Sequence, residues 1–304
     1  MKKDLITIKD LSKAQILELF KLAKALKKKP LSKSNSLNGK SLALVFQKPS
    51  NRTRVSFDVG MFQLGGNAIY LGPDELKLGV RESVKDVAKV LARYVDGVVV
   101  RTHEHQDVIS MAEAATVSVI NGLSKLLHPC QGLSDLFTID EYFNDRKIKI
   151  SFIGDGNNVL HSLLLGCSIL GRDLSIATPV NCEPDPGIVA EAKRCAFANK
   201  STIELTNDPK ECAQNADVIY TDVWVSMGQE SSHEERMNAF KGFQINAELL
   251  ACAKENTLIM HCLPAHRGEE ITDEILDSKN SIVYDQAENR LHVQKAILLT
   301  LLGG

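Results

Sequence analysis

Short apolar stretches alternate with longer stretches of helical spacing along nearly the whole chain. Residues 41–47 (SLALVFQ) form a short apolar run, and residues 54–66 carry apolar side chains at helical spacing and end in two glycines. Residues 67–72 (NAIYLG) are again strand-like. A strand, a helix and another strand in succession indicate a parallel sheet covered by helices. The alternation therefore predicts an α/β fold.

The pattern restarts after residues 144–147 (NDRK), which predicts two doubly wound parallel-sheet domains joined by interdomain helices. We expect the first domain at residues 1–140 and the second at residues 141–287. A helical stretch at 128–143 bridges them, and the last helix, within 288–304, is expected to pack back on the first domain. At 304 residues the chain is long enough to bury a core in each domain.

Charge and cysteine content exclude several classes of protein. The formal net charge is -2, and residues of both signs are mixed along the chain, which argues against a nucleic-acid or membrane-surface protein. The N-terminus is too polar for a signal peptide, and no apolar run reaches about 18 residues, the length of a membrane helix. Seven cysteines without any CxxC pair indicate reduced thiols, so we expect a cytoplasmic protein.

Polar residues follow the predicted strands, at the edge where ligands gather in open α/β sheets. The first such stretch is Ser50–Arg54 (SNRTR), between a strand and a helix. Its backbone N–H groups, the helix dipole, two arginines and two hydroxyls suit the capture of a phosphate. The alternative is an ordinary helix start, with Ser50 or Asn51 as the N-cap and the arginines in solvent.

Two further polar positions lie in the first half of the chain. Arg101 ends the strand-like run GVVVR, where an anion would sit, although a solvated arginine is an equally good interpretation. His128 and Gln131 are three residues apart at a predicted helix start and so face the same way. They could polarise and hold a carbonyl group, and the alternative is a buried or capping histidine.

In the second half, residues 152–159 (FIGDGNNV) resemble a dinucleotide-binding turn, but Val159 occupies the third glycine position. The following strand also ends without the acidic residue that holds a ribose, which excludes a nicotinamide cofactor. Asp222 and the pair His261–Cys262 end two more strands. We expect no zinc there, because no second Cys/His pair has ligand spacing.

Seven motifs together resemble the carbamoyltransferases, in particular the ornithine carbamoyltransferases. They occur in the order of that family: SNRTR, ESVKDVAKVLARYVDGVVVR, HPCQGLSDLFTI, GDGNNV, DVWVSMGQE, HCLPAHRGEE and AENRLHVQKA. The HCLP and SMG sequences differ from those of the aspartate carbamoyltransferases. The resemblance covers nearly the whole chain.

The resemblance implies a set of site residues. Carbamoyl phosphate would bind to Ser50, Asn51, Arg52, Thr53, Arg101, His128, Gln131, Cys262, Leu263 and Arg290. Ornithine would bind to Asn158, Asp222, Ser226 and Met227. The catalytic residues would be Arg101, His128, Asp222, Cys262 and Arg290.

The resemblance also implies the activity: the δ-amine of L-ornithine attacks carbamoyl phosphate and yields L-citrulline and phosphate, a reaction of arginine metabolism. It implies a homotrimer, without a metal or an organic cofactor, in which residues 73–83 reach a neighbouring subunit's site. Asn51 stands where the family commonly has Thr, and Lys77 falls near a common Gln. Two alternatives stay open: a relative that uses another amine, and a binding protein without catalysis.

Overall fold

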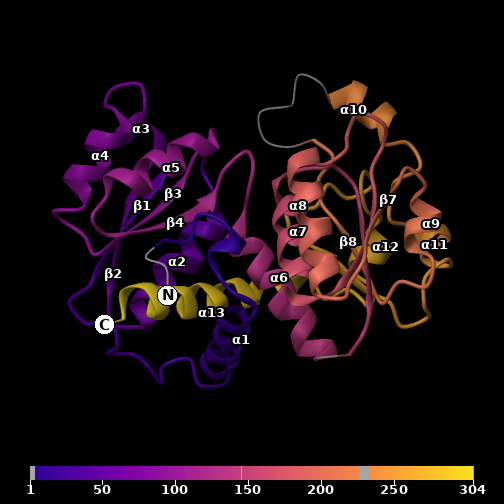
Figure 1. The fold of residues 1–304 in the computed structure, drawn as a ribbon, viewed down its shortest axis with the longest axis horizontal. Helices are drawn as coiled ribbons and strands as arrows, with labels where there is room; N and C mark the ends of the chain where they lie inside the picture. The colour runs from indigo at the N-terminus through magenta and orange to yellow at the C-terminus, as the bar shows by residue number, and fades with distance from the viewer. Residues whose placement is uncertain (1–3, 145, 226–232, 304) are drawn as a thin grey trace. The chain divides into compact units, whose positions relative to one another are not determined.

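The computed structural model describes residues 4–144, 146–225 and 233–303. Two compact units divide the chain (Figure 1). Unit 1 consists of Met1–Phe137 and Glu288–Gly304, and unit 2 of Thr138–Ala287. The chain leaves unit 1 within helix α6 (Pro129–Phe143) and returns within helix α13 (Val283–Leu302).

Unit 1 is built on a four-stranded parallel sheet. Its strands are β1 (Ser41–Phe46), β2 (Asn67–Leu71), β3 (Gly97–Arg101) and β4 (Ser118–Leu123), in the spatial order β2-β1-β3-β4. The chain moves outward from β1 to β2 and then crosses back to β3, so the winding reverses between β1 and β3. This reversal places the carboxyl ends of β1 and β3 beside the crevice where ligands of doubly wound sheets bind.

Helices cover both faces of this sheet. Unit 1 contains η1 (Ile8–Asp10), α1 (Lys13–Lys28), α2 (Asn51–Gln63), α3 (Pro73–Leu76), α4 (Val84–Leu91), α5 (His105–Ala114) and the parts of α6 and α13 that belong to it. Val98 and Val100 of β3 pack with buried residues of α4 and α5, including Val87 and Met111. On the other face Gly97 lets α13 approach, because a Cβ atom there would lie 2.8 Å from Leu302 Cδ2.

Unit 2 carries a five-stranded parallel sheet. Its strands are β5 (Lys149–Ile153), β6 (Asp173–Ala177), β7 (Ile203–Thr206), β8 (Val218–Thr221) and β9 (Leu258–His261), in the order β7-β6-β5-β8-β9. Its helices are α7 (Asn158–Leu170), α8 (Pro186–Ala198), α9 (Pro209–Ala213), α10 (His233–Ala239), α11 (Ala247–Leu250) and α12 (Asp273–Leu276). The α7–α8 pair covers one face and α9, α11 and α12 the other (Figure 1). The winding reverses between β5 and β8, the second ligand-binding crevice of the chain.

The sequence prediction of two parallel-sheet α/β domains is confirmed, but some element bounds were wrong. Helix α2 begins at Asn51, not at residue 54, because Ser50 caps it: its backbone is extended and its hydroxyl accepts the Thr53 N–H. Helix α13 begins at Val283, five residues before the predicted 288. Helix α5 was not predicted.

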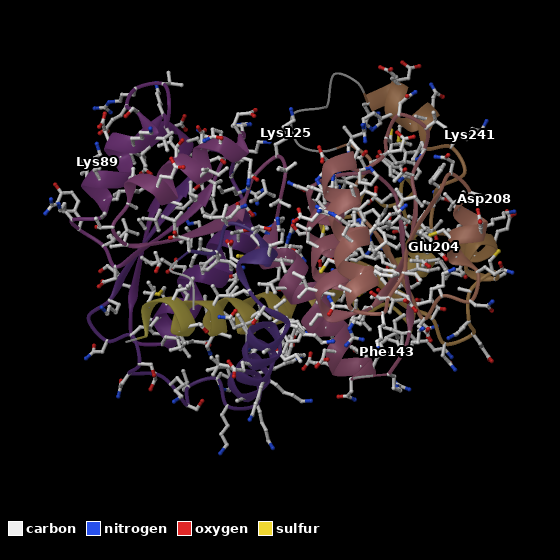
Figure 2. All side chains as sticks on the ribbon, in the orientation of Figure 1. Lys89, Lys125, Phe143, Glu204, Asp208 and Lys241 are labelled. Carbon is white, nitrogen blue, oxygen red and sulfur yellow. The ribbon has the colours of Figure 1, made fainter. Side chains whose placement is uncertain are left out.

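Charged side chains of both signs cover the surface of each unit. Lys89 and Lys125 of unit 1 and Glu204 of unit 2 are exposed examples (Figure 2). In the part of the chain that the structure describes, no helix combines the length and the apolar character that a membrane crossing requires.

Candidate active site

The N-cap and first turn of α2 form the centre of the candidate site in unit 1. Ser50 accepts a hydrogen bond from the Thr53 N–H at 3.4 Å, and its hydroxyl donates to Thr53 Oγ1 at 3.1 Å. The first N–H groups of a helix have no partner within the helix, and the dipole gives this end a partial positive charge. Ser50 is therefore the N-cap, as in the alternative interpretation, and the same turn is also suited to an anion.

Helix α13 brings Arg290 to this turn from the far end of the sequence. Its Nη2 donates to Thr53 Oγ1 at 2.7 Å, and both side chains are buried. The two residues are 237 positions apart in the chain. Arg290 thus adds a buried guanidinium to a turn that already carries Arg52.

Arg101, the last residue of β3, is buried, and its Nε atom has no hydrogen-bond partner among the described residues. Burial, followed by the positive charges of Arg290 and Arg52, lowers the pKa of Arg101 to about 10. The three cations therefore destabilise one another in the absence of a ligand. Because a bound anion relieves that repulsion, the cluster has the electrostatics of a phosphate site.

His128 and Gln131 lie at the start of α6, both buried. Burial lowers the pKa of His128 well below its usual value, and the charges of Arg290, Arg101 and Arg52 lower it further. His128 is therefore neutral near pH 7, and it can donate one hydrogen bond without adding charge. Gln131 Nε2 donates to Asp135 Oδ1 at 2.8 Å, which fixes the orientation of its amide.

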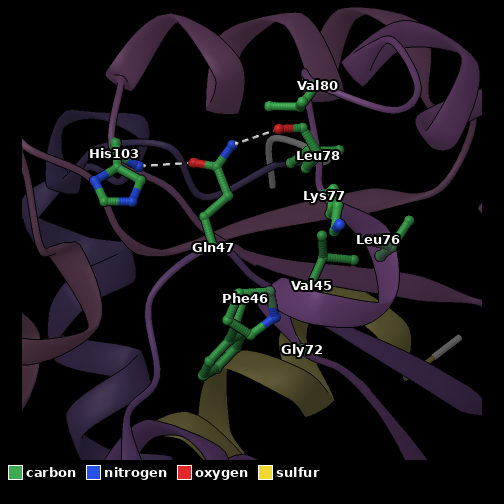
Figure 3. Close-up of a pocket in the computed structure, with 10 residues that line it drawn as sticks. Val45, Phe46, Gln47, Gly72, Leu76, Lys77, Leu78, Val80 and His103 are labelled. Atoms are coloured by element: carbon green, nitrogen blue, oxygen red, sulfur yellow. Dashed lines mark hydrogen bonds between the residues drawn. The ribbon is translucent and has the colours of Figure 1, made fainter.

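A cavity of about 300 Å³ opens in unit 1 beside the end of β1. It is lined by Val45, Phe46, Gln47, Gly72, Pro73, Leu76, Lys77, Leu78, Val80 and His103. The Gln47 amide connects two other residues that line the cavity: its Nε2 donates to Leu78 O at 3.1 Å, and its Oε1 accepts the His103 N–H at 2.8 Å (Figure 3). Lys77 has a left-handed backbone with φ of 43° and lines this cavity of its own unit.

Asp222, directly after β8, is the centre of the candidate site in unit 2. Its Oδ1 accepts the Val223 N–H at 2.8 Å, and its Oδ2 accepts Asn157 Nδ2 at 2.8 Å. Cys262, directly after β9, approaches Oδ1 with its Sγ at 2.9 Å. Asp222 is buried. Three donors therefore compensate a buried carboxylate at the crevice between β5 and β8.

The turn after β9 is shaped by His261. Its Nδ1 accepts the Leu263 N–H at 2.8 Å, and Leu263 has a left-handed φ of 58° before the cis Leu263–Pro264 bond. His261 is fully buried and also contacts Glu270. This contact fixes the backbone next to Cys262.

Of the residues predicted for the amino-acid end, Asn158 is the first residue of α7, at the same crevice. Ser226 and Met227 lie outside the described residues. The neighbouring Asn157, to which the sequence assigned no role, caps α7 and donates a hydrogen bond to Asp222.

Arg236 and Asp155 were missed from the sequence, where Arg236 sits in the charged run HEER without any spacing signal. Arg236 Nη2 pairs with Asp155 Oδ1 at 2.7 Å, and its Nε donates to Trp224 O. Burial raises the pKa of Asp155, and Arg236 partly offsets that rise. The pair connects α10 to the ends of β5 and β8.

Residues 3–141 match the family model described as the carbamoyl-P binding domain of aspartate/ornithine carbamoyltransferase, and residues 146–301 match its Asp/Orn binding domain. The chain belongs to the aspartate/ornithine carbamoyltransferase family. The second match runs past Ala287 into the part of α13 that belongs to unit 1.

Curated relatives are identical to this carbamoyltransferase at about half of the aligned positions. Ornithine carbamoyltransferase of Archaeoglobus fulgidus is 51% identical over 304 residues, which cover 99% of this chain and 98% of that protein. The Bacillus subtilis enzyme of the same name is 50% identical over 301 residues, 99% of this chain and 94% of that protein.

The solved structure of ornithine carbamoyltransferase from Pyrococcus furiosus superposes with a TM-score of 0.96 at 48% identity, covering 99% of this chain and 97% of that one. The Thermus thermophilus structure gives a TM-score of 0.90 at 43% identity, with 99% of each chain covered. This family member therefore shares its complete fold with them.

Proposed function

We propose that this chain transfers the carbamoyl group of carbamoyl phosphate to the δ-amine of L-ornithine, giving L-citrulline and phosphate. The observation that carries the proposal is the group of three arginines in unit 1: the half-buried Arg52 in the first turn of α2 and the buried Arg101 and Arg290, whose charges act on one another. The full-length relatives named ornithine carbamoyltransferase support the choice of ornithine.

Unit 1 is the proposed carbamoyl-phosphate domain. Ser50, Asn51, Arg52 and Thr53 bind the phosphate through the two hydroxyls and the first N–H groups of the helix, and the guanidinium groups pair with it; the Thr53 N–H itself donates to the Ser50 hydroxyl. The Arg290–Thr53 hydrogen bond orders both donors before the ligand arrives, so little reorganisation is needed on binding. Asn51 replaces a side-chain donor worth roughly 1 kcal/mol, while the N–H groups of the turn remain.

Arg101, His128 and Thr53 are the proposed donors to the carbamoyl oxygen, and Gln131 holds the carbamoyl amide. Negative charge develops on that oxygen when the amine attacks, and buried, ordered donors stabilise it more than water does. His128 suits this role because it is neutral and buried.

Unit 2 is the proposed ornithine domain. The Asp222 carboxylate, held by Asn157 and the Val223 N–H, binds the α-ammonium group. Asn158, Ser226 and Met227 complete the grip on the α-amino and carboxylate groups. Cys262 and Leu263 are proposed to contribute to the reaction centre.

The reaction balances without a cofactor. The lone pair of the neutral δ-nitrogen forms the new C–N bond, the tetrahedral intermediate then breaks its C–O bond, and phosphate leaves. An amine of this kind has an ordinary pKa of about 10, so the site must bind it deprotonated. The proton that nitrogen loses is accepted by the departing phosphate.

The activity test uses the purified full chain with carbamoyl phosphate and four amines in separate reactions: ornithine, N-acetylornithine, putrescine and aspartate. We expect citrulline from ornithine and at most trace ureido products from the others. A preference for another amine would keep the unit 1 assignment and overturn that of Asp222. If no amine gives a product but carbamoyl phosphate still binds measurably, the chain is a binding protein without catalytic activity.

We further propose that the enzyme acts in the cytoplasm, in arginine biosynthesis. All seven cysteines are thiols, which suits a reducing compartment. The Pyrococcus furiosus relative is named an anabolic ornithine carbamoyltransferase, which supports the direction of the pathway.

Self-association as a homotrimer is proposed through unit 1. Val55 and Phe62, seven positions apart on one face of α2, are 56% and 78% exposed. Such a stripe supports an interface with other copies of the chain.

Phe62→Asp is expected to shift the protein from trimer to monomer in light scattering at micromolar concentration, because it places a charge in an apolar contact. The exposed Phe197 in unit 2 supplies a matched control, since Phe197→Asp should leave the mass unchanged. A trimer that persists in Phe62→Asp would exclude this face of α2 as the interface.

A further inference from the structure

Three metal-ligating side chains converge in the turn between β9 and α12, and no step of the proposed reaction uses them. His266, Glu269 and Glu270 each offer one ligand atom, and these atoms lie within 4.8 Å of one another. His266 Nδ1 is 3.4 Å from Glu269 Oε2. The two atoms are within ion-pair distance, but they make no hydrogen bond.

Each of the two carboxylates is held through one oxygen by a histidine. Glu269 Oε1 faces His233 Nε2 at 3.3 Å. Glu270 Oε1 lies 3.0 Å from His261 Nε2 and accepts the His266 N–H at 2.7 Å. Because the Leu263 N–H donates to His261 Nδ1, the His261 proton lies on Nε2 and is donated to Glu270.

The second oxygen of each carboxylate has no such donor. Glu269 Oε2 and Glu270 Oε2 are both buried, and neither has a hydrogen-bond partner among the described residues. The Glu270 side chain is 0% exposed. A buried carboxylate oxygen without a donor is costly, and a bound cation compensates such an oxygen.

We propose that His266 Nδ1, Glu269 Oε2 and Glu270 Oε2 bind a zinc ion, with a water in the fourth position. Ligand atoms about 2.0–2.1 Å from a tetrahedral Zn²⁺ are about 3.3–3.4 Å apart, the separation of His266 Nδ1 and Glu269 Oε2. Two carboxylates balance the two positive charges of the ion. His233 and His261 then serve as outer hydrogen-bond partners that orient the ligating carboxylates, as such partners do in protein metal sites.

Cysteine spacing gave no sign of this site, because its ligands are one histidine and two glutamates of a single turn. It shares no ligand with the second ligand group of unit 2, which consists of Asp222, His261 and Cys262, although His261 of that group also contacts Glu270. That group contains a thiol and residues of the proposed reaction. A decisive experiment must therefore distinguish the two.

The test is a calorimetric titration of the metal-free full chain with Zn²⁺. We expect one tight site per chain, a loss of affinity of at least 100-fold in His266→Ala and Glu269→Gln, and a loss of 10- to 100-fold in His233→Ala, which removes an outer partner. Glu274→Gln is the matched control, since it makes the same change at an exposed glutamate a few residues along and should bind zinc normally.

Co²⁺ in place of Zn²⁺ identifies the ligands. The proposed site contains no sulfur, so the spectrum should show d–d bands without thiolate-to-metal charge transfer, and Cys262→Ser should not change it. Charge-transfer bands that vanish in Cys262→Ser, or zinc affinity unchanged in both His266→Ala and Glu269→Gln, would overturn the proposal. Thermal unfolding of each metal-free variant checks that it is folded.

Discussion

Arg101→Met is expected to lower kcat/KM for carbamoyl phosphate by about 1,000-fold while leaving the metal-free, ligand-free protein at least as resistant to heat. Removing one donor to a developing oxyanion costs about 10²- to 10³-fold in rate, and Arg101 is also a proposed phosphate ligand. Methionine keeps the length of the aliphatic stem and removes only the charged group.

The expected stability follows from the pKa of Arg101. A basic group whose pKa is lowered to about 10 in the folded state binds its proton more weakly there than in the unfolded chain. The folded protein therefore carries a cost in stability at every pH below about 10, and this cost decreases as the pH rises above about 10. At about 1.4 kcal/mol per pKa unit it is on the order of 3 kcal/mol at pH 7.

Thermal unfolding with and without phosphate tests this reasoning. Phosphate should raise the Tm of the wild type, because it binds only the folded state, and should raise that of Arg101→Met much less. Arg93→Met, at an exposed arginine of unit 1, is the control and should behave like the wild type. Normal turnover by Arg101→Met would remove Arg101 from the reaction centre.

The alternation of short and long apolar patterns was enough to predict two parallel-sheet units, because each strand and helix of a doubly wound fold carries its own periodicity. The order of the strands was not available from the sequence, since pairing joins segments far apart in the chain. The prediction therefore found polar strand ends after β1 and β3, but only the order β2-β1-β3-β4 places both at one crevice.

In the candidate sites, too, contacts between sequence neighbours could be predicted, and contacts between distant segments could not. Ser50 and Thr53 are neighbours in sequence, so their shared turn could be predicted, and capping explains why the helix begins three residues earlier than expected. The contact of Thr53 with Arg290 spans 237 residues, and only the family resemblance pointed to it. Nothing in the sequence pointed to the Asp155–Arg236 pair, because a charged run looks the same in sequence whether its arginine lies in solvent or pairs with a buried carboxylate.

Asp222→Asn is expected to raise the KM for ornithine by about 100-fold and to change the KM for carbamoyl phosphate by less than about threefold. The asparagine keeps the shape, and its Oδ1 can still accept the Val223 N–H, but its amide NH2 cannot accept a hydrogen bond from Asn157, so the variant removes the charge and that one hydrogen bond. Loss of one member of a buried, hydrogen-bonded charge pair costs about 2–5 kcal/mol, and the ornithine ammonium is the proposed other member. The proposed ligands of carbamoyl phosphate are arginines of unit 1.

Steady-state kinetics with each substrate varied in turn measures both constants, and calorimetry with carbamoyl phosphate alone checks the second directly. Glu204→Gln, which neutralises an exposed carboxylate on β7 of the same unit, should change neither constant. Equal losses for both substrates would contradict the placement of Asp222 at the amino-acid end. A loss confined to ornithine would assign the α-ammonium to Asp222.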